Sequence, residues 1–297
     1  MSETSRHQLS DVLLVILHFG GAEMTHQCLF SLRNAGHADV VVVDNDPREI
    51  FDIPDGLSFP VRIVRTGGGM GFAEANNFGV GAARQSHHRL IYLVNNDIVF
   101  THGSIDALRA SFDDEAVGVA GPTVFFTGPS RQLWAHGGRI FWLSVSIDGI
   151  RKMPKEDKSD VDYIPAAALM TTAKVWDMVG GLPEKYCFAF EEAEFALDAK
   201  KRGYRVVANA KSQVLHEVGD SSNREPMYYY NTVRNRIRFG QYLFGRRVGW
   251  FLGALSGFAR SYSFRRQRLF YRAVVDEIND VPLTRATLGR IREQFPA

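Results

Sequence analysis

The sequence is poor in cysteine, in long apolar runs and in net charge, and each shortage excludes a class of protein. Two cysteines among 297 residues, Cys28 and Cys187, cannot form a disulfide framework, and Cys28 lies in an apolar helical pattern typical of a buried side chain. No segment approaches the roughly 20 uninterrupted apolar residues of a membrane-spanning helix. The polar segment Met1–Ser10 lacks the apolar core of a signal sequence. We therefore expect a cytoplasmic protein.

Acidic residues are missing from one long stretch. The formal net charge of +2 is too small to indicate nucleic-acid binding, but no aspartate or glutamate occurs from Met227 to Val275. Aromatic residues interleaved with arginines on expected helices are typical of a surface that meets an anionic membrane. A helical subdomain packed on the core with a basic outer face explains the pattern equally well, and a nucleic-acid partner is not expected. The ten arginines of this stretch are Arg234, Arg236, Arg238, Arg246, Arg247, Arg260, Arg265, Arg266, Arg268 and Arg272.

Apolar strands alternate with helices in the first 120 residues. The chain is 45% hydrophobic and long enough for one or two domains with a large core. Strands that alternate with helices imply a mainly parallel sheet with right-handed crossovers, which is an α/β fold. The expected strands are residues 12–17, 40–43, 61–64, 90–94 and 117–120, and the expected helices begin near Thr25, Ala73 and Ser104.

Polar or glycine-rich segments follow three of these strands. They are Asp44–Asp46, Thr66–Phe72 and Asn95–Asp97. The carboxyl ends of parallel strands share one edge of the sheet, where open α/β sheets bind nucleotides. One carboxylate flanked by amides suits a divalent cation held against a phosphate, although turn-forming residues that only end a strand are equally common. The glycine-rich segment has neither the Lys-Ser/Thr of a P-loop nor the spacing of the dinucleotide fingerprint.

The pattern changes beyond Pro122. Short strands joined by turns are expected, followed by a charged, mobile loop over residues 149–162. A helix near Val175–Val179 ends at Gly180. Two separate late strands are then expected at residues 206–207 and 214–215, and His216 follows the second of them. A lone histidine is more often structural than a ligand.

Three carboxylates open another expected helix. Glu191, Glu192 and Glu194 follow Phe190, and the helix continues to Arg202. Acidic residues are favourable at a helix N-terminus, which is one explanation. The flanking apolar residues favour a second: like charges in a partly buried cleft raise at least one pKa, as a general base requires.

Seven motifs of the chain match those of a known family and occur in the same order. The chain resembles the inverting glycosyltransferase family 2 with the GT-A fold, especially its rhamnosyltransferase-like branch, from about Val12 to Phe239. No single motif is decisive, but their order is highly specific. The motifs are Val42-Val43-Asp44-Asn45, Gly71-Phe72-Ala73-Glu74-Ala75-Asn76-Asn77-Phe78-Gly79, Leu93-Val94-Asn95-Asn96-Asp97, Gly180-Gly181-Leu182-Pro183-Glu184, Phe190-Glu191-Glu192-Ala193-Glu194, Leu215-His216 and Tyr230-Asn231-Thr232-Val233-Arg234-Asn235.

The resemblance implies roles for particular residues. Asp97 matches the last residue of the DxD motif and His216 the late histidine of the metal site, so together they imply a Mg or Mn cofactor. Glu192 falls on the position of the catalytic base, where the family often has aspartate. Asp44 is implied to contact the nucleobase, and Glu194 to orient sugar or acceptor. The other substrate-binding positions implied are His18, Gly71, Phe72, Asn76, Asn77, Asn96, Glu191 and Arg234.

The resemblance also implies the organisation and activity. We expect a GT-A nucleotide-sugar-binding and catalytic domain over residues 1–222 and a helical, basic and aromatic extension over residues 223–297. The expected activity is metal-dependent inverting transfer from dTDP-rhamnose or a UDP-hexose to a surface polysaccharide or a lipid-linked glycan. This places the protein in the cytoplasm, at the inner face of the membrane, and leaves open whether it forms a homo-oligomer. The competing hypotheses are a non-catalytic nucleotide- or carbohydrate-binding protein and a nucleotidyltransferase.

Overall fold

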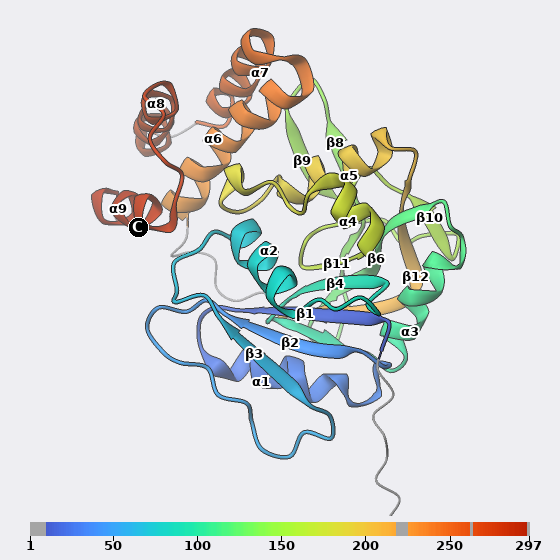
Figure 1. Ribbon diagram of the computed structural model, residues 1–297. Coiled ribbons are helices and arrows are strands. Elements are labelled where there is room, and N and C mark those ends of the chain that lie inside the picture. The colour runs from blue at the N-terminus through green and yellow to red at the C-terminus, as the bar shows by residue number, and fades with distance from the viewer. Residues whose placement is uncertain (1–9, 218–224, 262–263, 296–297) are drawn as a thin grey trace, which may run out of the picture.

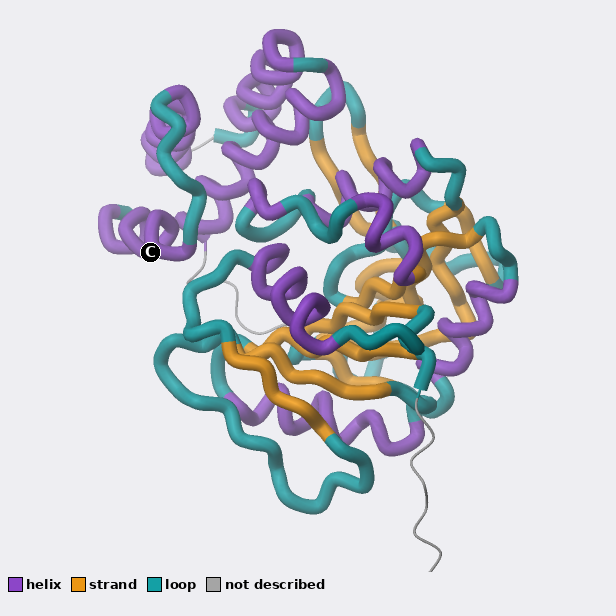
Figure 2. Tube along the Cα trace, in the orientation of Figure 1, coloured by secondary structure: helices purple, strands orange, loops and turns teal. Residues whose placement is uncertain are grey.

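The structure, a computed structural model, describes residues 10–217, 225–261 and 264–295 (Figure 1). A ten-stranded sheet forms its centre, with helices on both faces (Figure 2). The strand order is β10-β12-β6-β11-β4-β1-β2-β3, with β5 paired to β12 and β7 to β6. The strands of this sheet are β1 (Val12–His18), β2 (Asp39–Asp44), β3 (Val61–Arg65), β4 (Leu90–Asn95), β5 (Ile98–Phe100), β6 (Val117–Phe126), β7 (Leu133–His136), β10 (Lys158–Asp160), β11 (Ala168–Thr172) and β12 (Arg205–His216).

The first half of the sheet is parallel, as expected, and the second half is mixed. Strands β3, β2, β1 and β4 run parallel to one another. Strand β11 lies between β4 and β6 and is antiparallel to both. Strand β12 runs parallel to β6, with a register shift between Asn209 and Gln213. The expectation of two separate late strands was therefore wrong: they are two parts of β12, joined across this irregularity.

Alternate residues of the buried strands point into two separate cores. Leu13, Val15 and Leu17 pack on one face, whereas Val12, Leu14 and Ile16 pack on the other. Strands that are buried on both faces read as continuous apolar runs, which is why the sequence revealed them. The first face is covered by α2 (Phe72–Ala83), α4 (Ala173–Val179) and α5 (Glu191–Lys201), and the second by α1 (Ala22–Ser31) and α3 (Ser104–Arg109). Short 3-10 helices are η1 (Leu32–Asn34), η2 (Ala110–Asp113) and η3 (Glu184–Tyr186).

Three local expectations need correction. Thr25 lies inside α1, whose first turn follows Gly21, and its side chain is buried instead of capping the helix. Ser104 is the first residue of α3, and the capping position is Gly103 in the left-handed conformation. The expected mobile loop over residues 149–162 contains β10, which pairs with β12. Before it, β8 (Gly138–Phe141) and β9 (Ser146–Gly149) form a separate antiparallel hairpin.

Four helices make up the end of the described chain: α6 (Glu225–Phe244), α7 (Arg246–Phe258), α8 (Phe264–Ile278) and α9 (Arg285–Gln294). Helix α6 places Phe239 in the core on the first face of the sheet. Tyr229, Tyr230 and Val233 of the same helix form a third core with α8 and α9. The domain boundary expected between residues 222 and 223 lies outside the described residues and stays a prediction. Within the described part of the chain, no helix is both long and apolar enough to cross a bilayer.

Candidate active site

Three strand ends bring polar residues together at one edge of the sheet. In the parallel register, His18 at the end of β1 lies beside Asp44 at the end of β2, and Leu17 lies beside Asn95 at the end of β4. This is the edge at which open α/β sheets bind ligands. The polar segments that the sequence placed after these strands therefore belong to one region.

Asp44 and Asn45 organise one side of this edge. Asp44 is buried, and its carboxylate accepts hydrogen bonds from the backbone N–H of Phe51 (3.1 Å) and of Asp46 (3.4 Å). The Asn45 side chain donates to the carbonyl of Met70 (3.0 Å) and accepts from the Met70 N–H (3.2 Å). Asn45 thus fixes the glycine-rich segment against the end of β2, a role that the sequence alone did not assign.

The loop after β1 is contacted by a distant part of the chain. The guanidinium of Arg285, the first residue of α9, lies 3.8 Å from the centre of the Phe19 ring. Burial lowers the pKa of Arg285. Nearby, the Arg48 side chain holds the pKa of the Asp46 carboxyl well below its usual range, and the N–H of Gly20 also donates to that carboxylate (2.8 Å). The end of the chain therefore reaches the ligand-binding edge of the sheet.

Asp97 and His216, the two residues implied to bind metal, lie together. Their side chains meet with Asp97 Oδ2 and His216 Nε2 3.2 Å apart, because antiparallel pairing of β5 with β12 sets Ile98 opposite His216. Asp97 Oδ1 and His216 Nδ1 are both buried and have no hydrogen-bond partner among the described residues. Buried polar atoms are almost always paired, so two orphaned atoms here fit a site completed by another group. Carboxylate oxygen is a donor suited to Mg²⁺ and Mn²⁺, and imidazole is a common metal ligand in proteins.

His18 and Asn96, which were predicted to bind substrate, both contact α1. His18 is buried, with Nδ1 2.6 Å from Thr25 Oγ1, and its ring packs on Phe51. The Asn96 amide donates to the same Thr25 oxygen (3.0 Å). These contacts tie the ends of β1 and β4 to α1. Burial lowers the pKa of His18, which keeps its imidazole neutral.

A second histidine cluster lies at the opposite edge of the sheet. Asp39 Oδ2 lies 3.1 Å from His87 Nε2 and 2.9 Å from His88 Nε2. The spacing resembles a metal site, but His88 Nδ1 accepts a hydrogen bond from the N–H of Gln85 (2.9 Å). A neutral His88 therefore carries its proton on Nε2 and donates it to Asp39. We interpret this cluster as a hydrogen-bonded link between β2 and residues 87–88.

The three carboxylates at the start of α5 have different surroundings. Glu191 is 2% exposed, and burial together with the charge of Glu192 raises its pKa well above the usual value. Glu192 is 8% exposed, and burial raises its pKa to about 7. Glu194 accepts hydrogen bonds from Tyr186 and from Lys185 (2.8 Å). Glu194 is thus engaged by the protein, whereas one oxygen each of Glu191 and Glu192 is buried without a partner among the described residues.

Glu192 lines a cavity. Aromatic, basic and acidic side chains share its wall, and Arg236 among them is 7% exposed. One wall residue, Trp134, also packs edge-on against the His216 ring, with 4.7 Å between ring centres. Trp134 therefore links the wall of the Glu192 cavity to the Asp97–His216 pair. Its lining residues are Trp134, Ala135, Ile147, Asp148, Gly149, Arg151, Tyr163, Pro165, Ala189, Phe190, Glu192, Tyr228, Thr232 and Arg236.

A strained turn positions Glu191 and Glu192. Cys187, Ala189 and Phe190 all have positive φ angles, of 63°, 63° and 81°, which cost energy for residues other than glycine. Two buried amides on α6 hold this turn. Asn231 donates to the carbonyl of Phe188 (2.7 Å), and Asn235 to the carbonyls of Phe188 (2.8 Å) and Ala189 (2.9 Å).

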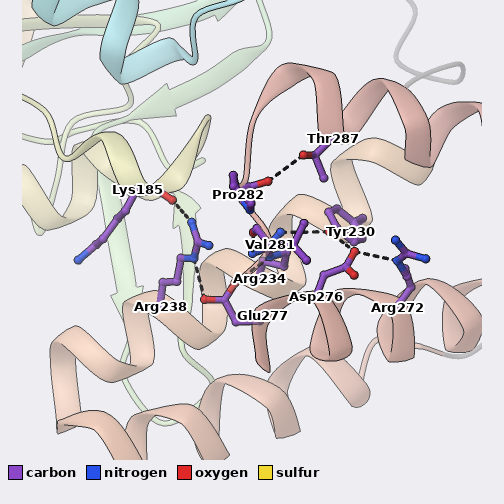
Figure 3. A network of polar contacts seen from close by, with 10 residues as sticks. All are labelled: Lys185, Tyr230, Arg234, Arg238, Arg272, Asp276, Glu277, Val281, Pro282 and Thr287. Carbon is purple, nitrogen blue, oxygen red and sulfur yellow. Dashed lines mark hydrogen bonds and ion pairs between the residues drawn. The ribbon is translucent and has the colours of Figure 1, made fainter. Parts of the chain in front are cut away.

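These two asparagines were missed from the sequence as site residues. They lie four positions apart, on the same side of a helix, and an i, i+4 pair of asparagines in the Tyr230–Asn235 motif was the available signal. Arg234 was chosen from that motif instead. Its side chain is fully buried and bonds to Glu277 (2.7 Å), Tyr230 (3.1 Å) and the carbonyl of Val281 (Figure 3). The expectation that Arg234 binds substrate is therefore corrected: its donors fasten α6 to α8 and to the segment before α9.

The start of α2 contacts the same turn. The N–H of Phe72 donates to the carbonyl of Cys187, and a Cβ on Gly71 would lie 3.1 Å from that oxygen. The Asn77 amide bonds to Leu182 through both its nitrogen (2.8 Å) and its oxygen (2.9 Å), and so it fastens α2 to the chain at Leu182. Asn76 is buried and donates to the carbonyl of Phe72 (2.9 Å). The glycine-rich segment and the Glu192 turn are thus in direct contact.

Comparison with known proteins bears on the family and the fold. Residues 14–178 match the model of the family described as glycosyl transferase family 2. The chain is 23% identical over 248 residues to the low-salt glycan biosynthesis hexosyltransferase Agl10 of Haloferax volcanii, covering 81% of this chain and 78% of that protein.

Two solved structures share the fold. The mannosyltransferase PcManGT from Pyrobaculum calidifontis, in complex with GDP-Man and Mn²⁺, matches 92% of this chain and 88% of its own, with a TM-score of 0.56 and 11% identity. GalNAc-T7 with UDP, GalNAc and Mn²⁺ matches 96% of this chain, with a TM-score of 0.63 and 12% identity, and the chain spans 58% of that protein. The mixed sheet with helices on both faces is a GT-A-like fold. Because the family match covers more than half of the residues, the chain belongs to glycosyl transferase family 2.

Proposed function

We propose that the protein is a metal-dependent inverting glycosyltransferase in which Glu192 is the general base. One observation carries the proposal: Glu192, a buried carboxylate with a raised pKa, lines a cavity that shares Trp134 with the Asp97–His216 pair. A base whose pKa lies near neutral pH is matched to taking a proton from a hydroxyl group. The neighbouring Asp97 and His216 offer donors for a cation.

The reaction proposed is a single displacement. Glu192 accepts the proton of an acceptor hydroxyl, whose oxygen attacks the anomeric carbon of the donor sugar. The bond from that carbon to the nucleoside diphosphate breaks, and attack from the opposite face inverts the configuration. Mg²⁺ or Mn²⁺ held by Asp97 and His216 would supply the positive charge that stabilises the leaving diphosphate.

The raised pKa of Glu191 supports this assignment. Its pKa is raised above that of an ordinary carboxyl by burial and by the charge on Glu192. Two adjacent buried carboxylates are poorly able to ionise together, so a neutral Glu191 leaves the single negative charge on Glu192. The residue that faces the cavity is then the one able to accept a proton.

The substrates are proposed from the relatives and from the edge of the sheet. A donor of the dTDP-rhamnose or UDP-hexose class would place its nucleotide near Asp44 and the glycine-rich segment. The hexosyltransferase relative acts in glycan biosynthesis, by its name, which supports a hexose donor. The acceptor is a surface polysaccharide or a lipid-linked glycan, so we propose that the protein works in contact with the inner face of a membrane.

A donor panel tests the metal site. We expect release of nucleoside diphosphate from one of dTDP-rhamnose, UDP-hexoses or GDP-mannose with Mn²⁺, and its loss with EDTA. Asp97→Asn should lower that rate more than about 100-fold, because the metal contributes several kcal/mol to the transition state. It should also abolish the Mn²⁺-dependent rise in melting temperature with donor. Asp55→Asn, at an exposed loop carboxylate, is the matched control. Donor turnover that is equal with and without metal would contradict the proposal, and release of pyrophosphate from a nucleoside triphosphate would indicate a nucleotidyltransferase.

A further inference from the structure

Helix α7 carries an apolar stripe that faces away from the protein. Val248, Phe251, Leu255 and Phe258 are 48–62% exposed. Their spacing of three, four and three residues places them on one side of the helix. An exposed apolar stripe of four large residues is unusual on a soluble surface, where large apolar side chains normally occur singly.

The opposite side of α7 is built for close packing on α6. A Cβ on Gly249 would collide with the backbone of Gly240, and a Cβ on Gly253 with the backbone of Arg236. Two glycines four positions apart therefore let the two helix backbones approach closely. Because this glycine face attaches α7 to the protein, the apolar stripe is not needed to hold the helix in place.

A second exposed apolar group lies at the tip of the β8–β9 hairpin. Phe141 and Trp142 are about half exposed, and Leu143 is 84% exposed. These residues are more than 100 positions before α7 in the sequence. The turn that carries them ends at Val145, whose N–H donates to the carbonyl of Trp142 (3.1 Å).

Hydrogen bonds attach this tip directly to α7. Ser256 of α7 donates to the carbonyl of Ser144, and Arg236 of α6 donates to the carbonyl of Val145 (2.9 Å) and to Ser256 Oγ (3.0 Å). Figure 1 shows the hairpin rising beside α7 at the end of the molecule away from α1. The tip and the stripe therefore form one surface, the hairpin–α7 surface, defined by Trp142, Leu143, Val248, Phe251, Leu255 and Phe258.

The charges around this surface indicate which kind of partner it binds. Arg246 and Arg247 are exposed in the first turn of α7. No acidic residue occurs in the sequence from Met227 to Val275 or from Arg139 to Ile147. In a two-fold dimer the same patch meets itself, which would bring cations against cations. An anionic bilayer instead offers an apolar interior for the stripe and negative headgroups for the arginines.

We propose that the hairpin–α7 surface inserts into the headgroup region of an anionic membrane. The same hairpin contributes Ile147, Asp148 and Gly149 to the wall of the Glu192 cavity. Insertion of its tip would thus set the cavity close to the headgroups, where the sugar of a lipid-linked acceptor lies. This inference rests on the proposed lipid-linked acceptor, but membrane binding and donor turnover are measured separately.

Vesicle sedimentation tests the proposal with the full-length protein. We expect binding to vesicles of phosphatidylglycerol and phosphatidylcholine at low salt, little binding to phosphatidylcholine alone, and release at high salt. The paired variants Trp142→Ser with Leu143→Ser, and Phe251→Ser with Leu255→Ser, should each weaken binding about tenfold or more, because each removes two large apolar side chains. Phe30→Ser, at an exposed phenylalanine of α1, is the matched control and should bind as the wild type does.

Tryptophan fluorescence gives a second measurement of the same contact. Brominated lipid should quench the wild-type protein, and Trp142→Phe should lose most of the quenching while still sedimenting with vesicles. Unchanged melting temperatures would show that the variants are folded. Equal vesicle binding by both paired variants and wild type would overturn the proposal, as would a concentration-dependent dimer that these variants abolish. Failure of vesicle binding with intact metal-dependent donor turnover would reject the membrane surface and leave the proposed reaction in place.

Discussion

Glu191 and Glu192 are neighbours in the sequence and differ in what they can do. Both carboxyls are buried, but only Glu192 lines the cavity. Successive residues on a helix point about 100° apart, so one cavity cannot receive both side chains equally. Burial raises both pKa values, and the mutual repulsion of the two charges adds to that of Glu191. Burial of two carboxyls in the first turn of α5 therefore costs stability, as is common at functional sites.

This cost predicts how stability depends on pH. The folded pKa of Glu192 is about 7, against 4.5 for an ordinary glutamate. Between these two pH values the folded state therefore holds a proton that the unfolded state has lost. The stabilisation is complete below about pH 4.5 and is lost as pH rises through 7. Glu192→Gln carries no charge, so relative to wild type it should gain about 3 kcal/mol of unfolding free energy between pH 5 and pH 8.

Denaturant unfolding at a series of pH values measures this effect. Glu74→Gln, at an exposed carboxylate on α2, is the control and should follow the wild-type pH dependence. A difference between Glu192→Gln and wild type that is constant from pH 5 to pH 8 would show that Glu192 is ionised at low pH, and the assignment of a raised pKa would be wrong.

At the scale of secondary-structure elements, α6 supports the turn that α5 needs. Three non-glycine residues with positive φ angles precede Glu191, and such a conformation persists only where the surroundings hold it. Asn231 and Asn235, both fully buried, supply those contacts. They are positioning residues for Glu192.

Removing these amides should change turnover more than donor binding. Asn235→Ala leaves the carbonyls of Phe188 and Ala189 without their donor, which should cost about 1–3 kcal/mol of stability. It should also lower kcat about tenfold or more through displacement of Glu192, with little change in donor affinity. Asn235→Asp, which keeps the size and removes the donor, should behave similarly. A loss of stability with unchanged kcat would mean that the amides only hold the fold.

The order and type of most elements could be predicted from the sequence, but their pairing could not. Strands β1, β2 and β4 are buried on both faces, so their apolar runs are recognisable. The antiparallel position of β11 could not be predicted, because the residues Ala168–Thr172 do not show in which direction the strand runs relative to its neighbours. The sequence did not show that the two late strands form one strand, β12, because the irregular segment from Asn209 to Gln213 separates their apolar residues.

For the candidate site as well, single residues could be predicted from the sequence, but their contacts could not. Asp97 and His216 were predicted as metal ligands through motifs, and the structure shows that their side chains meet. Arg234 was misassigned because the acid-free stretch conceals its partners. Asp276 and Glu277 lie just beyond that stretch, in α8 (Figure 3). Asp276 binds Arg272 of the same helix, and Glu277 binds Arg234 and Arg238 of α6. Composition counts charges but does not show which of them are paired.

For the whole molecule, α6 and α9 both contact the region of the candidate site. Helix α6 holds the turn before Glu191, and α9 brings Arg285 over Phe19 at the ligand-binding edge of the sheet. Helix α7 presents the hairpin–α7 surface. The two explanations of the basic stretch are therefore compatible, since α6 packs on the core while α7 keeps an exposed apolar and basic face.

The central claim is that Glu192 accepts the proton in an inverting transfer, and Glu192→Gln tests it most directly. With a donor identified from the panel and its acceptor, turnover and anomeric configuration can be followed by NMR, and donor affinity by calorimetry. We predict an inverted product in wild type, a loss of about 10²–10⁴-fold in kcat for Glu192→Gln, and nearly unchanged donor affinity. Glu194→Gln, which loses contacts to Lys185 and Tyr186, should retain most of kcat. Near wild-type turnover by Glu192→Gln, or a product with retained configuration, would contradict the account.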